Sequence, residues 1–143
     1  MTTTTPTTSV SFERAAAMLA VHLDGHRLPE PAYLRVNTRG AQSEVCVQLG
    51  ATTIGTVTRD LLAWADTLPT VTAEAWRVRA GDSVHLSIAS TLTGPAGSIE
   101  LDVFGAVDYD PAQFRGLTSG DRRTVSLGQL RNWAALDVPG DRR

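Results

Sequence analysis

Residues 71–107 have the sequence VTAEAWRVRAGDSVHLSIASTLTGPAGSIELDVFGAV. Apolar side chains alternate with polar or small ones in three stretches of this segment, as is typical of half-buried β-strands. Two turns separate the stretches, Ala80-Gly81-Asp82 and Gly94-Pro95-Ala96-Gly97, and both contain residues that favour chain reversal. We therefore expect an antiparallel meander with strands at 71–79, 83–92 and 98–107.

The two turns also predict a register for the meander. The first turn places Trp76 opposite Leu86. The second places Ile88 opposite Val103. Both turns put the bulky apolar side chains on the same face, so we expect that face to be the core face. Its expected members are Trp76, Val78, Val84, Leu86, Ile88, Ile99, Leu101 and Val103.

The opposite face of the meander carries small and polar side chains in this register, with Arg77 directly opposite His85. It can be solvated surface, it can receive a second subunit because small side chains allow close approach, or it can form the floor of a pocket for a small acidic ligand. If the last helix of the chain does not fold over this face, we expect a homodimer to form across it. Five residues on it are candidates for a ligand site or an interface: Ala75, Arg77, His85, Asp102 and Phe104.

Three helices are expected outside the meander. The first covers 11–24, is capped by the serine at its start, and should end at Gly25. A second has an apolar stripe over 57–68. Ser126 caps the last helix, and Asp110-Pro111 is expected to start a short helical turn before it.

A β-hairpin is expected between the first two helices, with strands at 33–38 and 43–49. Pairing Val36 with Val45 puts the apolar side chains of both strands on one face. The order of elements is then α-β-β-α-β-β-β-α. It predicts an α+β two-layer sandwich, in which about three helices cover one face of a five-stranded antiparallel sheet.

The length of 143 residues indicates one domain. We place it at 10–136, between a Thr-rich tail at 1–9 and a second tail at 137–143, and expect both tails to be disordered.

The charge pattern restricts the possible partners. The formal net charge is −2, which argues against nucleic acids and anionic membranes as partners. All thirteen basic residues are arginine, so mechanisms that need a lysine are excluded. Arg122-Arg123 is a local basic excess near Arg115 and Arg131, and is either a solvated loop or an anion or partner site.

No intrachain disulfide can form, because Cys46 is the only cysteine of the chain. The N-terminal residues have no basic region followed by an apolar run, as a signal peptide would, and no stretch approaches the length of a membrane span. We expect a soluble cytoplasmic protein.

No metal site or cofactor is expected. His22 and His26 have the i, i+4 spacing that can hold zinc on a helix, but the expected helix end at Gly25 separates them. Cys46 has no histidine placed beside it by the sequence, so a catalytic role is not expected. The glycines form no nucleotide-binding motif.

The lysine-free composition, rich in Ala, Arg and Thr, resembles that of small proteins from GC-rich bacteria and their phages, a resemblance that implies no chemistry. We expect a non-enzymatic interaction or accessory protein that self-associates through the second sheet face or an edge strand. The alternatives are a small-ligand-binding domain or minor enzyme with a pocket between sheet and helices, and a nucleic-acid-associated protein.

Overall fold

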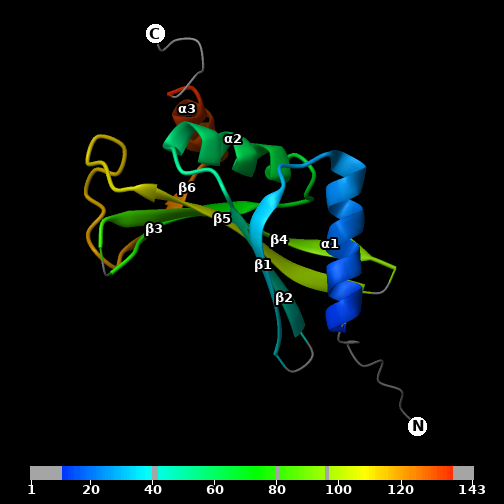
Figure 1. Ribbon diagram of the computed structural model, residues 1–143. Helices are drawn as coiled ribbons and strands as arrows, with labels where there is room; N and C mark the ends of the chain where they lie inside the picture. Colours follow the sequence, from blue (N-terminus) through cyan, green and yellow to red (C-terminus); the bar gives the residue numbers. More distant parts are fainter. Residues whose placement is uncertain (1–10, 40–41, 80, 96, 137–143) are drawn as a thin grey trace.

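Figure 1 shows the computed structural model of the chain, which describes residues 11–39, 42–79, 81–95 and 97–136. Over these residues the chain forms three helices and a six-stranded mixed sheet, which confirms the α+β class. The expected tails lie outside the described residues. The helices are α1 (Phe12–His26), α2 (Ile54–Ala65) and α3 (Leu127–Ala134). The strands are β1 (Pro31–Arg39), β2 (Gln42–Leu49), β3 (Thr72–Arg77), β4 (Ser83–Gly94), β5 (Gly97–Asp108) and β6 (Arg122–Val125).

The strand order is β1-β2-β5-β4-β3-β6, so the expectation of five antiparallel strands is wrong in two respects. β2 pairs with β5 in parallel, because α2 carries the chain across the sheet to β3 and the meander then returns to place β5 beside β2. β6 adds a sixth strand that pairs antiparallel with β3. β6 has four residues, too few to show an alternating pattern, and only Val125 among them is buried.

Two of the three expected registers are confirmed. Val36 pairs with Val45 in the β1–β2 hairpin. Ile88 pairs with Val103 in the β4–β5 hairpin, which also places Phe104 opposite Ser87. In both hairpins the partners are close in sequence, and the turn between them sets the register.

The expected register of β3 against β4 is wrong by one residue. Trp76 pairs with His85, and Arg77 pairs with Val84. The Val78 amide donates to the Ser83 carbonyl at 2.9 Å, so the connecting loop is one residue longer than expected. A shift of one residue moves every side chain of a strand to the other face. Trp76 therefore lies on the face opposite the helices, while Ala75 and Arg77 lie on the helix side.

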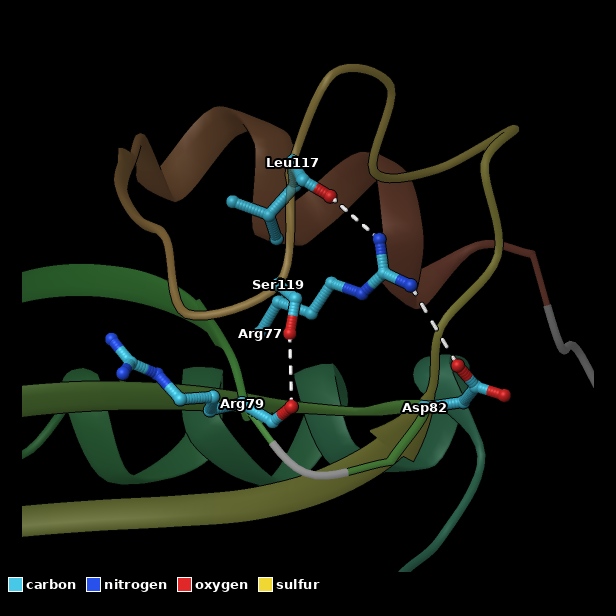
Figure 2. Close-up of polar contacts among 5 residues, drawn as sticks. All are labelled: Arg77, Arg79, Asp82, Leu117 and Ser119. Carbon is cyan, nitrogen blue, oxygen red and sulfur yellow. Dashed lines mark hydrogen bonds and ion pairs between the residues drawn. The ribbon is translucent and has the colours of Figure 1, made fainter.

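Arg77 holds the segment between β5 and β6 against the end of β3 (Figure 2). Its guanidinium lies 3.7 Å from the centre of the Tyr109 ring and donates from Nη1 to the Leu117 carbonyl at 3.0 Å. Nη2 pairs with Asp82 at 3.6 Å, and the Arg77 amide donates to the Asp121 carbonyl at 2.9 Å. These contacts explain the shifted register, because they fix Arg77 on the side where this segment packs.

The helices gather on one side of the sheet (Figure 1). Trp64 of α2 is fully buried, and its ring stacks on His22 of α1 with centroids 6.0 Å apart. α3 packs beside α2, where Arg59 donates to the Ala134 carbonyl at 2.9 Å. The last helix therefore lies in the helix layer and not over the second sheet face.

The structure corrects the expected end of the first helix. α1 does not end at Gly25 but continues to His26, and Arg27 takes the left-handed position with φ 52°. Leu28, one residue after this left-handed position, packs against the core. The helical turn expected after Asp110 is present as a single hydrogen-bonded turn, in which the Asp110 carbonyl accepts the Phe114 amide at 2.9 Å.

Gly105 marks the place where α2 crosses the sheet. A Cβ atom at this position would lie 2.8 Å from Cγ1 of Val57, which is fully buried. The Val57 side chain is stiff and its surroundings are packed, so it cannot turn away from a Cβ at residue 105. The whole helix would have to shift instead. The glycine therefore sets the distance between α2 and β5.

We expect Gly105→Ala to lower the free energy of unfolding by about 1–3 kcal/mol, as overpacking does. Urea denaturation measures the change, and Val57→Ala in the same chain should recover part of it. Gly25→Ala is the control, because a Cβ there meets nothing within 4 Å. It should be neutral or stabilise by up to about 1 kcal/mol. A Gly105→Ala protein as stable as the wild type would contradict the close contact.

Candidate functional site

A cavity of about 400 Å³ lies on the sheet face opposite the helices. All six strands contribute side chains to it. We call it the open-face cavity, because none of the described helices covers this face. Its lining residues are Arg35, Cys46, Glu74, Trp76, His85, Ser87, Asp102, Phe104 and Arg122.

The two edge strands reach the same cavity. Arg35 comes from β1 and Arg122 from β6, at opposite ends of the strand order. In a flat sheet of six strands these edges would be about 24 Å apart, with about 4.8 Å between neighbours. The sheet is strongly twisted (Figure 1). Side chains from both edge strands therefore line one cavity.

An aromatic row crosses the middle of the cavity. Trp76, His85 and Phe104 lie on the three neighbouring strands β3, β4 and β5. The His85 ring stacks on Phe104 with centroids 5.0 Å apart and an angle of 24°, and it meets Trp76 edge-on at 5.3 Å. All three are half-buried. The row offers a flat aromatic surface to a planar group.

Arg122 is already engaged at one end of the row. Its guanidinium lies 4.5 Å from the centre of the Trp76 ring and pairs with Glu74 at 2.8 Å. The two charged side chains are 57% and 40% exposed, so this ion pair adds little to stability. Its structural effect is to hold the arginine over the tryptophan.

Arg35 at the other end has a much weaker contact. Its Nη2 donates to Sγ of Cys46 at 4.0 Å, and within the described residues its side chain has no other hydrogen bond or ion pair. A guanidinium has five N–H donors, so most of them remain available. Arg35 is therefore the cation of the cavity that is best placed to receive an anion.

Asp102 lies in the middle of the sheet, directly opposite Cys46 across the parallel β2–β5 ladder. Burial, with the nearby charges of Glu44 and Glu74, raises the pKa of Asp102 from 3.8 to about 6, although Arg122 acts in the opposite direction. Asp102 therefore changes charge in the mildly acidic range. In its protonated form it can donate a hydrogen bond to a bound group.

Two further groups of the cavity, His85 and Cys46, favour their neutral forms. Burial, followed by the charge of Arg122, lowers the pKa of His85 from 6.5, so its ring is neutral at pH 7. Burial raises the pKa of the Cys46 thiol from 9.0 in spite of the contact with Arg35. A nucleophilic cysteine needs a lowered pKa. The cavity is thus equipped for binding and lacks an activated nucleophile at Cys46.

Three of the five residues singled out from the sequence come together in the cavity: His85, Asp102 and Phe104. Ala75 does not, because it is buried on the core face opposite Leu86. Arg77 does not, because it anchors the segment that follows β5. Both corrections follow from the shifted β3–β4 register, which also brings Trp76 and Glu74 into the site.

Arg35 and Cys46 were not predicted as site residues, and Arg122 was considered only within the basic pair Arg122-Arg123, as a solvated loop or an anion or partner site. The alternation within 43–49 does place Cys46 on the face opposite Val45 and Val47. The basic excess at Arg122 was visible, but the strand that carries it was not recognised. The sequence contains no pattern that reveals the pairing of β2 with β5 or of β3 with β6.

Comparisons of the chain with protein-family models, with curated proteins and with solved structures found no match. Within the part of the chain that the structure describes, no helix is long and apolar enough to cross a membrane. The same residues contain no group of three or more His, Cys, Asp or Glu side chains that could hold a metal ion. His22 and His26 do lie on one continuous helix, with ring centroids 4.6 Å apart.

The raised pKa of Asp102 predicts a pH-dependent effect of Asp102→Asn. Because the folded protein favours the protonated carboxyl, Asp102 contributes stability at low pH that is lost as the pH rises through about 6. The asparagine variant avoids this loss. It should be more stable than the wild type at pH 8, and the difference should shrink at pH 4.

Urea denaturation at both pH values measures this difference. Asp108→Asn, at the exposed end of β5, is the matched control for removing one carboxylate from the same strand. A wild type that is more stable than Asp102→Asn at pH 8 would show that ionised Asp102 is stabilised by its surroundings, contrary to the prediction.

Proposed function

We propose that this chain is a ligand-binding domain whose open-face cavity takes a small aromatic carboxylate. The observation that carries the proposal is the convergence of Arg35 and Arg122, from the two edge strands, on an aromatic floor. A ligand site combines a concave, partly apolar surface with a few converging polar groups, and its volume is about 300–1,000 Å³. The cavity has these properties, at about 400 Å³.

The contacts within the cavity suggest how such a ligand lies. Its ring packs on the stacked pair of His85 and Phe104, where an offset aromatic contact is favourable. Its carboxylate is received by Arg35, whose fork of donors fits two carboxylate oxygens. Arg122 is already paired with Glu74, so it borders the ligand from the other end. Asp102 acts as a hydrogen-bond donor when it is protonated.

The groups that line the open-face cavity favour binding of a ligand over its chemical conversion. The Cys46 thiol is held in its protonated form, and the other polar groups are hydrogen-bonding groups around an aromatic surface. We therefore propose a role in recognition or carriage of the ligand, in line with the non-enzymatic role expected from the sequence.

Self-association is a second candidate function, favoured by one observation. β1 is an edge strand of the sheet and exposes two large side chains, Tyr33 at 56% and Leu34 at 44%. An exposed edge strand can pair with the same strand of a second copy. Such a dimer would leave the floor of the open-face cavity free, so the two functions are compatible.

Isothermal titration calorimetry with 2-naphthoate tests the ligand proposal. Arg35→Gln should weaken binding about 10- to 100-fold, as the loss of a charge-assisted hydrogen bond does. Phe104→Leu should weaken it about two- to tenfold through loss of aromatic contact. Arg131→Gln, which changes an exposed arginine on α3, is the control and should leave the affinity unchanged. Equal affinities of the two arginine variants would contradict the proposed carboxylate contact.

Sedimentation equilibrium tests self-association. If β1 edges pair, the wild type should be dimeric and Leu34→Lys monomeric with an unchanged circular dichroism spectrum, because a lysine on an edge strand opposes pairing. Thr38→Lys, at another exposed position of β1, is the comparison that separates loss of apolar contact from added charge. A wild type that stays monomeric at high concentration would refute the dimer and leave the ligand proposal untouched.

A further inference from the structure

A second concavity lies far from the aromatic row, between α1 and the tip of the β4–β5 hairpin. Its volume is about 540 Å³. One stripe of α1 forms its first wall with Arg14, Ala17, Met18 and Val21, and the hairpin forms the second with Leu92 and Pro95. We call it the α1 groove. It is separate from the open-face cavity and shares no lining residue with it.

The wall that α1 gives to the groove is apolar but uncovered. The helix buries Ala15, Leu19 and His22 in the core, and the groove stripe lies beside this buried stripe. Val21 on the groove stripe is 72% exposed. Met18 lies close to Gly94 of the hairpin, where a Cβ would lie 3.3 Å from the Met18 Cε. The groove is therefore a shaped apolar surface that water now contacts.

The charges around the groove have one sign. No residue that lines it is acidic, and Arg14 stands at the end nearest the start of α1. Among the described residues no hydrogen bond or ion pair engages the Arg14 guanidinium. This contrasts with the chain as a whole, whose net charge is −2. The groove thus combines an apolar trough with one available cation.

Two histidines, His22 and His26, line the far end of the groove. Nε2 of His22 shares a hydrogen bond of 2.8 Å with Oγ1 of Thr67. Burial, and then the neighbouring His26, lower the pKa of His22. His22 is therefore uncharged at pH 7 and acts as part of the apolar wall. Arg14 therefore supplies the guanidinium of the groove, which can select an anionic ligand.

We infer that the α1 groove binds a medium-chain aliphatic carboxylic acid. The carboxylate pairs with Arg14, and the alkyl chain lies along α1 over Met18 and Val21 towards His22. From Arg14 to His22 the helix rises about 12 Å, at about 1.5 Å per residue, which suits an extended chain of about eight to ten carbons. An extended aliphatic chain suits the groove, because Ala17, Met18 and Val21 form an aliphatic wall along α1 and the aromatic rings of the groove, those of the two histidines, lie at its far end.

Isothermal titration calorimetry of the full chain with hexanoate, octanoate and decanoate, below their micelle concentrations, tests this inference. Each added methylene should tighten binding about two- to fourfold, as expected for burial of one CH₂ group. 1-Decanol should bind about tenfold more weakly than decanoate, because it lacks the charge that pairs with Arg14. Arg14→Gln should remove this difference between acid and alcohol.

A matched pair of helix variants locates the ligand. Val21→Glu places a carboxylate in the groove and should weaken decanoate binding at least tenfold. Ala20→Glu adds the same charge at the neighbouring exposed position, which does not line the groove, and should keep wild-type affinity. Both positions are exposed, so both variants should fold, and circular dichroism checks that they do.

Three results would overturn the inference. Equal decanoate affinities of Val21→Glu and Ala20→Glu would place the ligand elsewhere. Loss of decanoate binding in Arg35→Gln but not in Val21→Glu would assign it to the open-face cavity. A wild-type dimer that Val21→Glu dissociates, with no binding of decanoate, would assign the groove to a second copy of the chain. Failure of the 2-naphthoate experiment alone would leave this inference standing, because the two sites are separate.

Discussion

The parallel pairing of β2 with β5 is the constraint on which the rest of the architecture depends. It joins a local hairpin, β1–β2, to a local meander, β3–β4–β5, although the two segments are separated by α2 in sequence. Parallel neighbours need a long crossover connection, and α2 with the first two strands of the meander supplies it. Gly105 allows α2 to lie close on β5 at the crossing. Without this pairing the two halves would not form one sheet.

The same pairing assembles the open-face cavity. It sets Cys46 opposite Asp102 and thereby brings the hairpin, with Arg35, beside the aromatic row of the meander. The buried position of Asp102 is also a consequence, because the carboxyl lies on an inner strand with Glu44 and Glu74 nearby. The raised pKa of Asp102 therefore depends on the strand order as well as on the residues around it.

A feature could be predicted from the sequence when the residues that determine it lie close together along the chain. The β1–β2 and β4–β5 registers were predictable, because alternation and a local turn determine them. The β3–β4 register was not, because Arg77 is held by Leu117 and Tyr109, which lie far along the chain. His85, Asp102 and Phe104 were found because they lie on correctly paired strands. Trp76 was placed on the wrong face by the β3–β4 register, and Arg35 and Arg122 required the pairings of β2 with β5 and of β3 with β6, which no pattern in the sequence reveals.

The positions of the three tryptophans give the protein a built-in optical reporter. Trp64 and Trp133 are buried, at 0% and 6% exposure, whereas Trp76 is half-buried under Arg122 on the open face. Acrylamide in the solvent will therefore quench mainly the emission of Trp76. The blue-shifted emission of the two core indoles will report global unfolding instead. One fluorescence spectrum thus separates events in the cavity from loss of the fold, without any added dye.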